Sequence, residues 1–98
     1  MSSRSAPVDG FRLAFDRRGI AGGPPVVLLH GWPGNRRDYR KVVPLLADVA
    51  DVIVPDLRGF GGSDKHAVAV QHFYSATAQA ASVVGLIHEL GVHEVILA

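Results

Sequence analysis

The residues best suited to chemistry stand in one short turn, His30-Gly31-Trp32-Pro33-Gly34, directly after an apolar run at residues 26–29. Four consecutive branched or long apolar residues predict a strand that is buried on both faces. Glycine can adopt backbone angles that other residues avoid, and proline fixes its own, so the turn should be tight. It presents the Trp32 N–H at the carboxyl end of a central strand, where open α/β sheets bind ligands.

A second glycine-rich turn follows the next apolar run, at residues 52–55. It reads Asp56-Leu57-Arg58-Gly59-Phe60-Gly61-Gly62-Ser63-Asp64. Its glycines superficially match a dinucleotide-binding fingerprint, but Asp64 occupies the third glycine position and a loop rather than a helix should follow. The pattern therefore does not indicate nucleotide binding.

No serine of the chain stands in a nucleophile elbow, which has the form Gly-x-nucleophile-x-Gly. Ser63 comes closest, but Lys65 stands where the second glycine belongs, and the segment should be a long loop. Ser82 lies in the middle of a predicted helix. The sequence therefore contains no complete catalytic triad.

The histidines do not form a metal-binding pattern either. His88 and His93 flank a segment that resembles a zinc-protease helix, but the second histidine comes one residue late and follows a helix-stopping glycine. His66 and His72 lie in a polar loop without a set of acidic companions. We expect solvated loop histidines, no metal site and no cofactor.

The remaining segments alternate between strand and helix patterns. Strands are predicted at residues 11–17, 26–29, 52–55 and 94–98, and helices at 36–41, 44–50 and 75–90, with a variable loop at 65–74. This alternation predicts βαβ units and a mostly parallel sheet, hence an α/β fold. The long helix should turn one apolar stripe to the core: Ala76, Ala80, Val83, Val84, Ile87 and Leu90.

The first predicted helix is rich in positive charge. Asn35 should cap it, and Arg36, Arg37, Arg40 and Lys41 follow. We interpret these four cations as a solvated helix face; an anion-binding or partner-binding patch is the alternative.

Composition excludes several classes of protein. The chain has 98 residues, 48% of them hydrophobic, which suits one globular domain, and a net charge of +1, which does not favour nucleic acid or membrane binding. It has no cysteine, which fits a cytoplasmic location. No apolar run approaches the roughly 20 residues that span a bilayer. Residues 1–7 have no signal-peptide pattern and are predicted to be a disordered lead-in.

The last predicted strand, at residues 94–98, should leave apolar side chains exposed. Each large apolar side chain left in water forgoes about 1.5–3 kcal/mol of burial. We therefore expect residues 8–98 to be the N-terminal portion of a longer core domain, which is completed either by the remainder of the same chain or by another chain.

The two turns, in this order and at this separation, resemble the first half of the α/β-hydrolase family. The likeness covers residues 8–98 and is greatest to epoxide hydrolases and haloalkane dehalogenases. It implies that the Trp32 backbone N–H is an oxyanion-hole donor and that the Trp32–Pro33 peptide bond is cis. It further implies that Asp56 and Arg58 tie the second turn to the first, and that His30 braces the neighbouring turns. The residues implied to support the site are His30, Gly31, Pro33, Asp56, Arg58 and Gly59.

The resemblance also implies an activity for the parent protein. It would be a cofactor-independent hydrolase acting on a small epoxide, halide or ester, with an aspartate nucleophile just after Ala98 and an ester intermediate. A serine at that position would instead give an esterase, lactonase or perhydrolase. A non-catalytic binding protein on the same scaffold is the third alternative. The 98 residues alone are predicted to be inactive.

Overall fold

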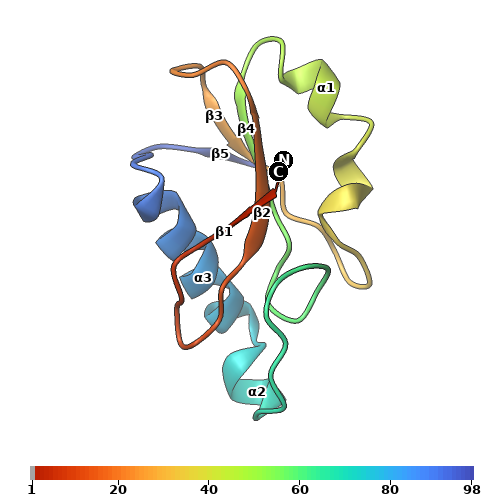
Figure 1. Ribbon diagram of the computed structural model, residues 1–98, viewed down its shortest axis with the longest axis vertical. Coiled ribbons are helices and arrows are strands. Elements are labelled where there is room, and N and C mark those ends of the chain that lie inside the picture. Colours follow the sequence, from red (N-terminus) through yellow and green to blue (C-terminus); the bar gives the residue numbers. More distant parts are fainter. Residues whose placement is uncertain (1) are drawn as a thin grey trace.

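A twisted sheet of five strands separates two helical layers in the computed structural model, which describes residues 2–98 (Figure 1). The elements, in chain order, are β1 (Ser2–Arg4), β2 (Ala14–Gly19), β3 (Pro25–Val27), η1 (Arg36–Tyr39), α1 (Val43–Leu46), β4 (Asp51–Pro55), α2 (Val70–Phe73), α3 (Ala76–Glu89) and β5 (Ile96–Leu97). The α/β class predicted from the sequence is confirmed.

The sheet is mixed, with the order β1-β2-β4-β3-β5. β4, β3 and β5 are parallel neighbours, whereas β2 pairs with both β1 and β4 in the antiparallel sense. Three of the five strands are therefore mutually parallel, and β1 and β2 extend the sheet in the antiparallel sense. The carboxyl ends of β3, β4 and β5 lie at the same end of the sheet, and both glycine-rich turns begin there.

The wholly apolar strands are explained by burial on both faces. Along β3 and β4, alternate side chains point to opposite sides of the sheet. Val27 and Ile53 pack against Val83 and Leu86 of α3. Val26, Leu28, Val52 and Val54 form a second core with Val43 and Ala50 on the side of α1. In Figure 1, α3 and α1 accordingly lie on opposite sides of the sheet.

The predicted disordered lead-in is wrong for residues 2–7, whereas Met1 lies outside the described residues. Ser2–Arg4 forms β1, which pairs with β2 from Ser2 beside Asp16 to Arg4 beside Ala14. Ser5 continues the pairing, since its N–H donates to the Leu13 carbonyl at 2.8 Å and its hydroxyl accepts from the Leu13 N–H at 2.8 Å. The composition of the segment is polar, but backbone pairing to a sheet edge needs no apolar side chain.

The segments that join β3 to β4 and β4 to α3 also differ from the prediction. Residues 36–41 form only a short 3₁₀ helix, η1, whose start is fixed by a capping box between Asn35 and Asp38. α1 ends at Leu46 rather than at residue 50. The predicted variable loop contains a single helical turn, α2.

The apolar stripe predicted for α3 is rotated relative to the observed one. The side chains that α3 buries are Ala78, Ser82, Val83 and Leu86. Val84 is instead 49% exposed, and Ala76 and Ala80 are exposed. The buried face contains a serine because Ser82 binds a buried arginine, described below, and hydrophobicity alone could not reveal this.

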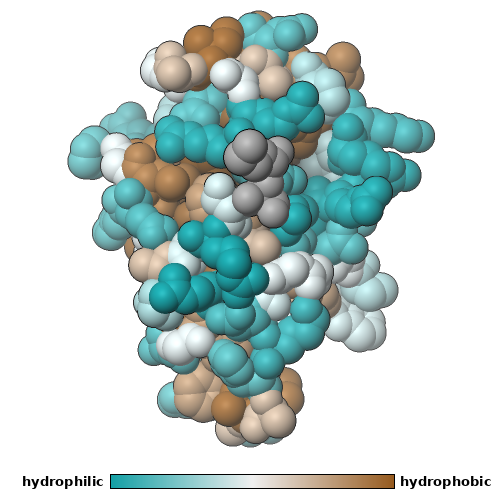
Figure 2. Space-filling model, viewed as in Figure 1, coloured by the Kyte–Doolittle hydropathy of each residue, from teal (hydrophilic) through white to brown (hydrophobic). Residues whose placement is uncertain are grey.

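β5 forms an apolar edge of the sheet, as predicted. It pairs with β3 alone, and Ile96 and Leu97 are each 58% exposed. Hydrophobic surface is visible where the chain enters β5, at the left of the molecule (Figure 2). Within residues 2–98, no helix has the length and apolar character needed to cross a membrane.

Candidate active site

His30 joins the two glycine-rich turns. Its ring is buried, with 5% of the residue exposed, and its Nε2 accepts a hydrogen bond from the Leu57 N–H at 2.9 Å. Because Nε2 is the acceptor, Nδ1 carries the ring proton and donates to the Gly31 carbonyl at 2.9 Å. The ring also packs edge-on against Phe60, with 5.1 Å between centroids. The arrangement engages both nitrogens of His30 and leaves none for a proton transfer.

Trp32 lies at the end of this turn with its side chain largely in solvent, 83% exposed. The Trp32–Pro33 peptide bond is cis, as the resemblance implied. The Trp32 N–H has no hydrogen-bond acceptor within the described residues, although its neighbours are held in place. The turn therefore offers a free backbone donor at the carboxyl end of β3.

The glycines of this turn do not supply the unusual backbone angles that the sequence predicts. Neither Gly31 nor Gly34 has a positive φ. A side chain at Gly34 would come within 2.8 Å of the Gly31 carbonyl and would overlap the Asp38 carboxylate, so Gly34 is required for close approach. An added Cβ at Gly31 meets nothing within 4 Å, and packing does not explain that glycine.

Asp56 anchors the second turn to the segment that follows the first. Its carboxylate is almost fully buried and accepts from the Arg36 N–H at 2.6 Å, from Arg36 Nη1 at 2.5 Å and from the Gly62 N–H at 2.9 Å. Arg36 also contacts Asp16, with Nε 3.1 Å from Oδ2. A buried carboxylate requires such partners to offset the cost of its desolvation. The predicted tie between the turns through Asp56 is thus present and runs through Arg36.

Arg58 does not tie the two turns together, contrary to expectation. Its guanidinium is fully buried, with Nε donating to the Ser82 hydroxyl at 2.7 Å and Nη1 to the Phe73 carbonyl at 3.1 Å. Nη2 donates to Asp9 at 3.1 Å. Arginine carries five N–H donors, and the acceptors of the Arg58 side chain come from residues 8–9 and from the helices α2 and α3.

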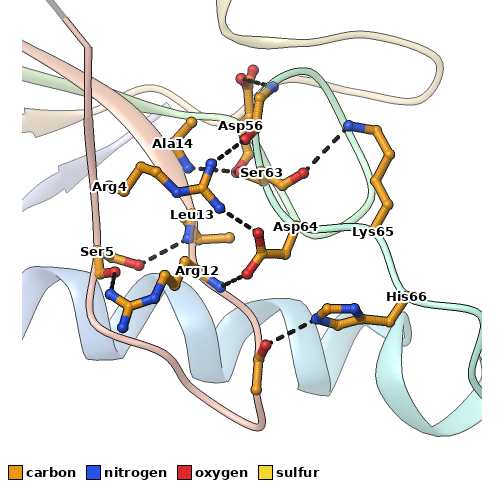
Figure 3. Close-up of polar contacts among 12 residues, drawn as sticks. Arg4, Ser5, Arg12, Leu13, Ala14, Asp56, Ser63, Asp64, Lys65 and His66 are labelled. Carbon is orange, nitrogen blue, oxygen red and sulfur yellow. Dashed lines mark hydrogen bonds and ion pairs between the residues drawn. The ribbon is translucent and has the colours of Figure 1, made fainter.

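The loop from Gly59 to Asp64 is held against the antiparallel pair β1 and β2, and the segment that joins them, by a polar network (Figure 3). Asp64 accepts from the Arg12 N–H at 2.9 Å and forms an ion pair with Arg4. The hydrogen bond from Arg12 and the charge of Arg4 lower the pKa of the Asp64 carboxyl below its ordinary value. Gly59 has a φ of +85°, and a Cβ there would lie 2.8 Å from the Tyr74 ring, so glycine is required.

The hydroxyls of Ser63 and Ser82 are both held in hydrogen bonds within the fold. The Ser63 hydroxyl donates to the Asp56 carbonyl at 2.5 Å and accepts from the Ala14 N–H at 2.9 Å, and the residue is buried. The Ser82 hydroxyl accepts from Arg58. His66 is not simply solvated, because its Nε2 lies 2.9 Å from the Gly10 carbonyl. No group of three or more potential metal ligands occurs among residues 2–98.

Two cavities open beside these turns. One, of about 530 Å³, is lined by Trp32, Leu57, Phe60, Lys65 and Tyr74 among others. The other, of about 420 Å³, is an apolar groove between α3, β5 and the segment that follows β3, and its lining includes His30, Val84 and Leu97. Leu57 contributes to both cavities. The apolar surface next to the free Trp32 amide is therefore extensive.

Sequence reasoning missed two supports of this site. The charge pattern predicts that Arg36 is a solvated cation, whereas two carboxylates bind it in the structure. The Tyr39 hydroxyl donates to the Leu29 carbonyl at 2.7 Å, just beyond the end of β3. The spacing of Asn35 and Asp38 was the available signal, because a capping box there fixes where Arg36 must point.

Taken together, the strand-turn geometry, the free amide and the supporting network define an α/β-hydrolase scaffold. The sequence model of the family described as alpha/beta hydrolase fold matches residues 24–98. The chain belongs to this family.

Its relatives include enzymes of two kinds. The chain is 43% identical over 65 residues to a soluble epoxide hydrolase of Corynebacterium sp., covering 66% of this chain and 22% of that protein. It is 41% identical over 70 residues to a haloalkane dehalogenase of Bradyrhizobium diazoefficiens, covering 71% and 23% respectively. The crystal structure of epoxide hydrolase A from Mycobacterium thermoresistibile superimposes with a TM-score of 0.85 at 32% identity, covering 99% of this chain and 30% of that one. The chain thus spans less than a third of each relative.

Proposed function

We propose that these residues form the N-terminal portion of the core domain of a hydrolase of the epoxide-hydrolase or haloalkane-dehalogenase type. The substrate would be a small epoxide or alkyl halide, and no cofactor would be needed. In this proposal the Trp32 backbone N–H is one of the donors of the oxyanion hole. His30, Gly31, Pro33, Asp56 and Gly59 hold that donor in place, and Arg58 fixes the second turn to α3.

The pairing of β3 with β5 is the observation that carries this proposal. The two strands are parallel, and the Leu29 N–H donates to the Ala98 carbonyl at 2.8 Å while the Ala98 N–H donates to the Val27 carbonyl at 3.0 Å. The carboxyl end of β5 therefore lies beside the start of the turn that carries Trp32. A nucleophile in the residues after β5 would stand next to the free amide.

The chemistry follows from that placement. An aspartate carboxylate would attack the carbon that bears the halogen, releasing halide, or a carbon of the epoxide, whose C–O bond would break while its oxygen takes up a proton; either attack gives an ester intermediate. A water molecule activated by a histidine would then attack the ester carbonyl. The oxyanion formed in that step would accept the Trp32 N–H. One such donor is worth about 2.7–4 kcal/mol of transition-state stabilisation.

A single turnover of the full-length chain in heavy-oxygen water tests the proposal. If an aspartate attacks, the oxygen of the first product comes from the carboxylate, so the first product is unlabelled and the protein acquires the label. Label in the first product would show direct attack by water and would contradict the proposal. Turnover of esters alone, through a serine acyl intermediate, would also contradict it and would favour the esterase alternative.

We further propose that the remainder of a hydrolase chain covers the apolar groove of about 420 Å³ and the free edge of β5. The exposed Ile96 and Leu97 lie at this edge. The 98 residues alone should then turn over no epoxide, alkyl halide or ester, because they supply a donor without a nucleophile. Activity of the isolated 98 residues that Ser63→Ala abolishes would contradict this.

A further inference from the structure

A basic cavity lies on the opposite face of the sheet from α3. It has a volume of about 230 Å³ and is lined by Asp16, Arg18, Arg36, Arg37, Arg40 and two valines. It shares no lining residue with the two cavities beside Trp32. Hydrophilic side chains gather at the right of the molecule, where the η1 segment lies (Figure 2).

The fold brings these arginines together from two separate segments. Asp16 and Arg18 are two residues apart in β2, so they point to the same face of the sheet. Their cross-strand partners, Val54 and Val52, belong to the core beneath α1, which identifies that face. The capping box that begins η1 places Arg37 and Arg40 over the same face.

The carboxylates nearest the cavity bind groups other than Arg18, Arg37 and Arg40. Asp16 and Asp56 both bind Arg36. Asp38 accepts from the Asn35 N–H as part of the capping box. Across residues 2–98, no carboxylate forms an ion pair with Arg18, Arg37 or Arg40. Three exposed arginines, which carry like charges that repel one another, thus line one cavity, and one of them, Arg40, also donates through Nη1 to the Arg37 carbonyl at 3.2 Å.

We propose that this cavity binds a phosphate group, either as the free anion or as a phosphate monoester. The planar fork of a guanidinium donates two parallel hydrogen bonds to neighbouring phosphate oxygens. A phosphate dianion balances more of the charge of three arginines than a single carboxylate can. A small cavity in a chain of net charge +1 suits a compact anion rather than a nucleic-acid strand. The site is a binding site only, and it is independent of the proposed hydrolysis.

The test is a titration of the full-length chain with inorganic phosphate and, separately, with phenyl phosphate. Both titrations are run at constant ionic strength, and binding is measured by phosphorus NMR or calorimetry. We expect saturable binding of one equivalent. Binding of both ligands would indicate a bare phosphate site, whereas binding of phenyl phosphate alone would assign the site to esters. The double variant R37Q/R40Q should bind about a hundredfold more weakly, since each lost charged hydrogen bond costs roughly tenfold in affinity.

Lys41→Gln is the matched control, because Lys41 lies on the same segment, is exposed and does not line the cavity. It removes one charge and should leave the affinity unchanged. Arg18→Gln provides a second test from the other segment, and circular dichroism checks that each variant is folded. No saturable binding to the folded chain would overturn the proposal. An equal loss in Lys41→Gln would also overturn it, since that result indicates diffuse charge attraction.

Discussion

The Leu57 N–H donates to His30 Nε2 across 2.9 Å, and this bond fixes the second glycine-rich turn to the first. His30 lies at the end of the strand segment that begins with β3, and Leu57 follows β4, so the bond links two parallel neighbours just beyond their carboxyl ends. The same ring holds the Gly31 carbonyl through Nδ1. The peptide that presents the Trp32 N–H is therefore fixed from one side by a histidine with a structural role.

Replacing His30 with alanine should lower the free energy of unfolding by about 1–3 kcal/mol, because the Leu57 N–H loses its acceptor in a partly buried site. Urea denaturation of the full-length chain measures the change. His93→Ala is the control, since His93 is exposed, and it should change stability by less than about 0.5 kcal/mol. Equal losses in the two variants would show that the bond to Leu57 does not stabilise the fold.

Asp56→Asn should destabilise the chain by about 3–5 kcal/mol, the usual effect of removing one partner of a buried ion pair. All three groups that contact the Asp56 side chain are donors, so the new amide NH₂ must face a donor. Asp48→Asn makes the same chemical change at an exposed position and should be nearly neutral. Thermal unfolding of both variants checks the prediction, and a stable Asp56→Asn protein would contradict the role of the Arg36 ion pair.

Gly61→Ala should cost more than Gly22→Ala. Both glycines have a positive φ, +50° and +80° respectively, so both substitutions carry the strain of that conformation, about 1–2 kcal/mol. A Cβ at Gly61 would also overlap the Asp56 carboxylate, whereas a Cβ at Gly22 meets nothing within 4 Å. The difference between the two unfolding free energies isolates the steric part. No difference would show that Asp56 can move away without loss.

The stability contributed by Asp64 should depend on pH in the acidic range. Its pKa is lowered in the folded chain, chiefly by the hydrogen bond from the Arg12 N–H. A carboxyl whose pKa is lower in the folded than in the unfolded chain stabilises the folded state at pH values above its unfolded-state pKa. This stabilisation is lost as the pH falls through the folded-state pKa. The stability difference between the wild type and Asp64→Asn should therefore be constant from pH 5 to 7 and shrink below about pH 4. Unfolding curves at several pH values measure it; a difference that grows with acidity would contradict the assignment.

The parts of the fold that repeat a pattern could be predicted from the sequence. The apolar runs that form β3 and β4 are buried on both faces, and their composition predicts central strands. The Ser75 cap and the long apolar segment after it predicted α3 closely. The two turns were recognisable because glycine and proline have strong conformational preferences of their own.

What could not be predicted depended on contacts between distant segments. β1 exists through backbone pairing with β2, to which its polar side chains give no clue. The face that α3 buries is set partly by Arg58, whose guanidinium binds Ser82 from 24 positions away. Arg36 is neutralised by Asp16 and Asp56, each 20 positions away. Such pairings become visible only once the sheet order is known.

The most direct test of the central claim replaces the Trp32 amide with an ester in the full-length chain, by incorporating indole-3-lactic acid at position 32. The substitution keeps the ring and replaces the backbone N–H with an oxygen, and it also makes the Gly31 carbonyl a weaker acceptor for His30 Nδ1. If that N–H stabilises the oxyanion, kcat should fall by about a factor of 10²–10³, whereas Trp32→Phe, which keeps the N–H, should leave kcat nearly unchanged. An ester variant as fast as the wild type would contradict the claim.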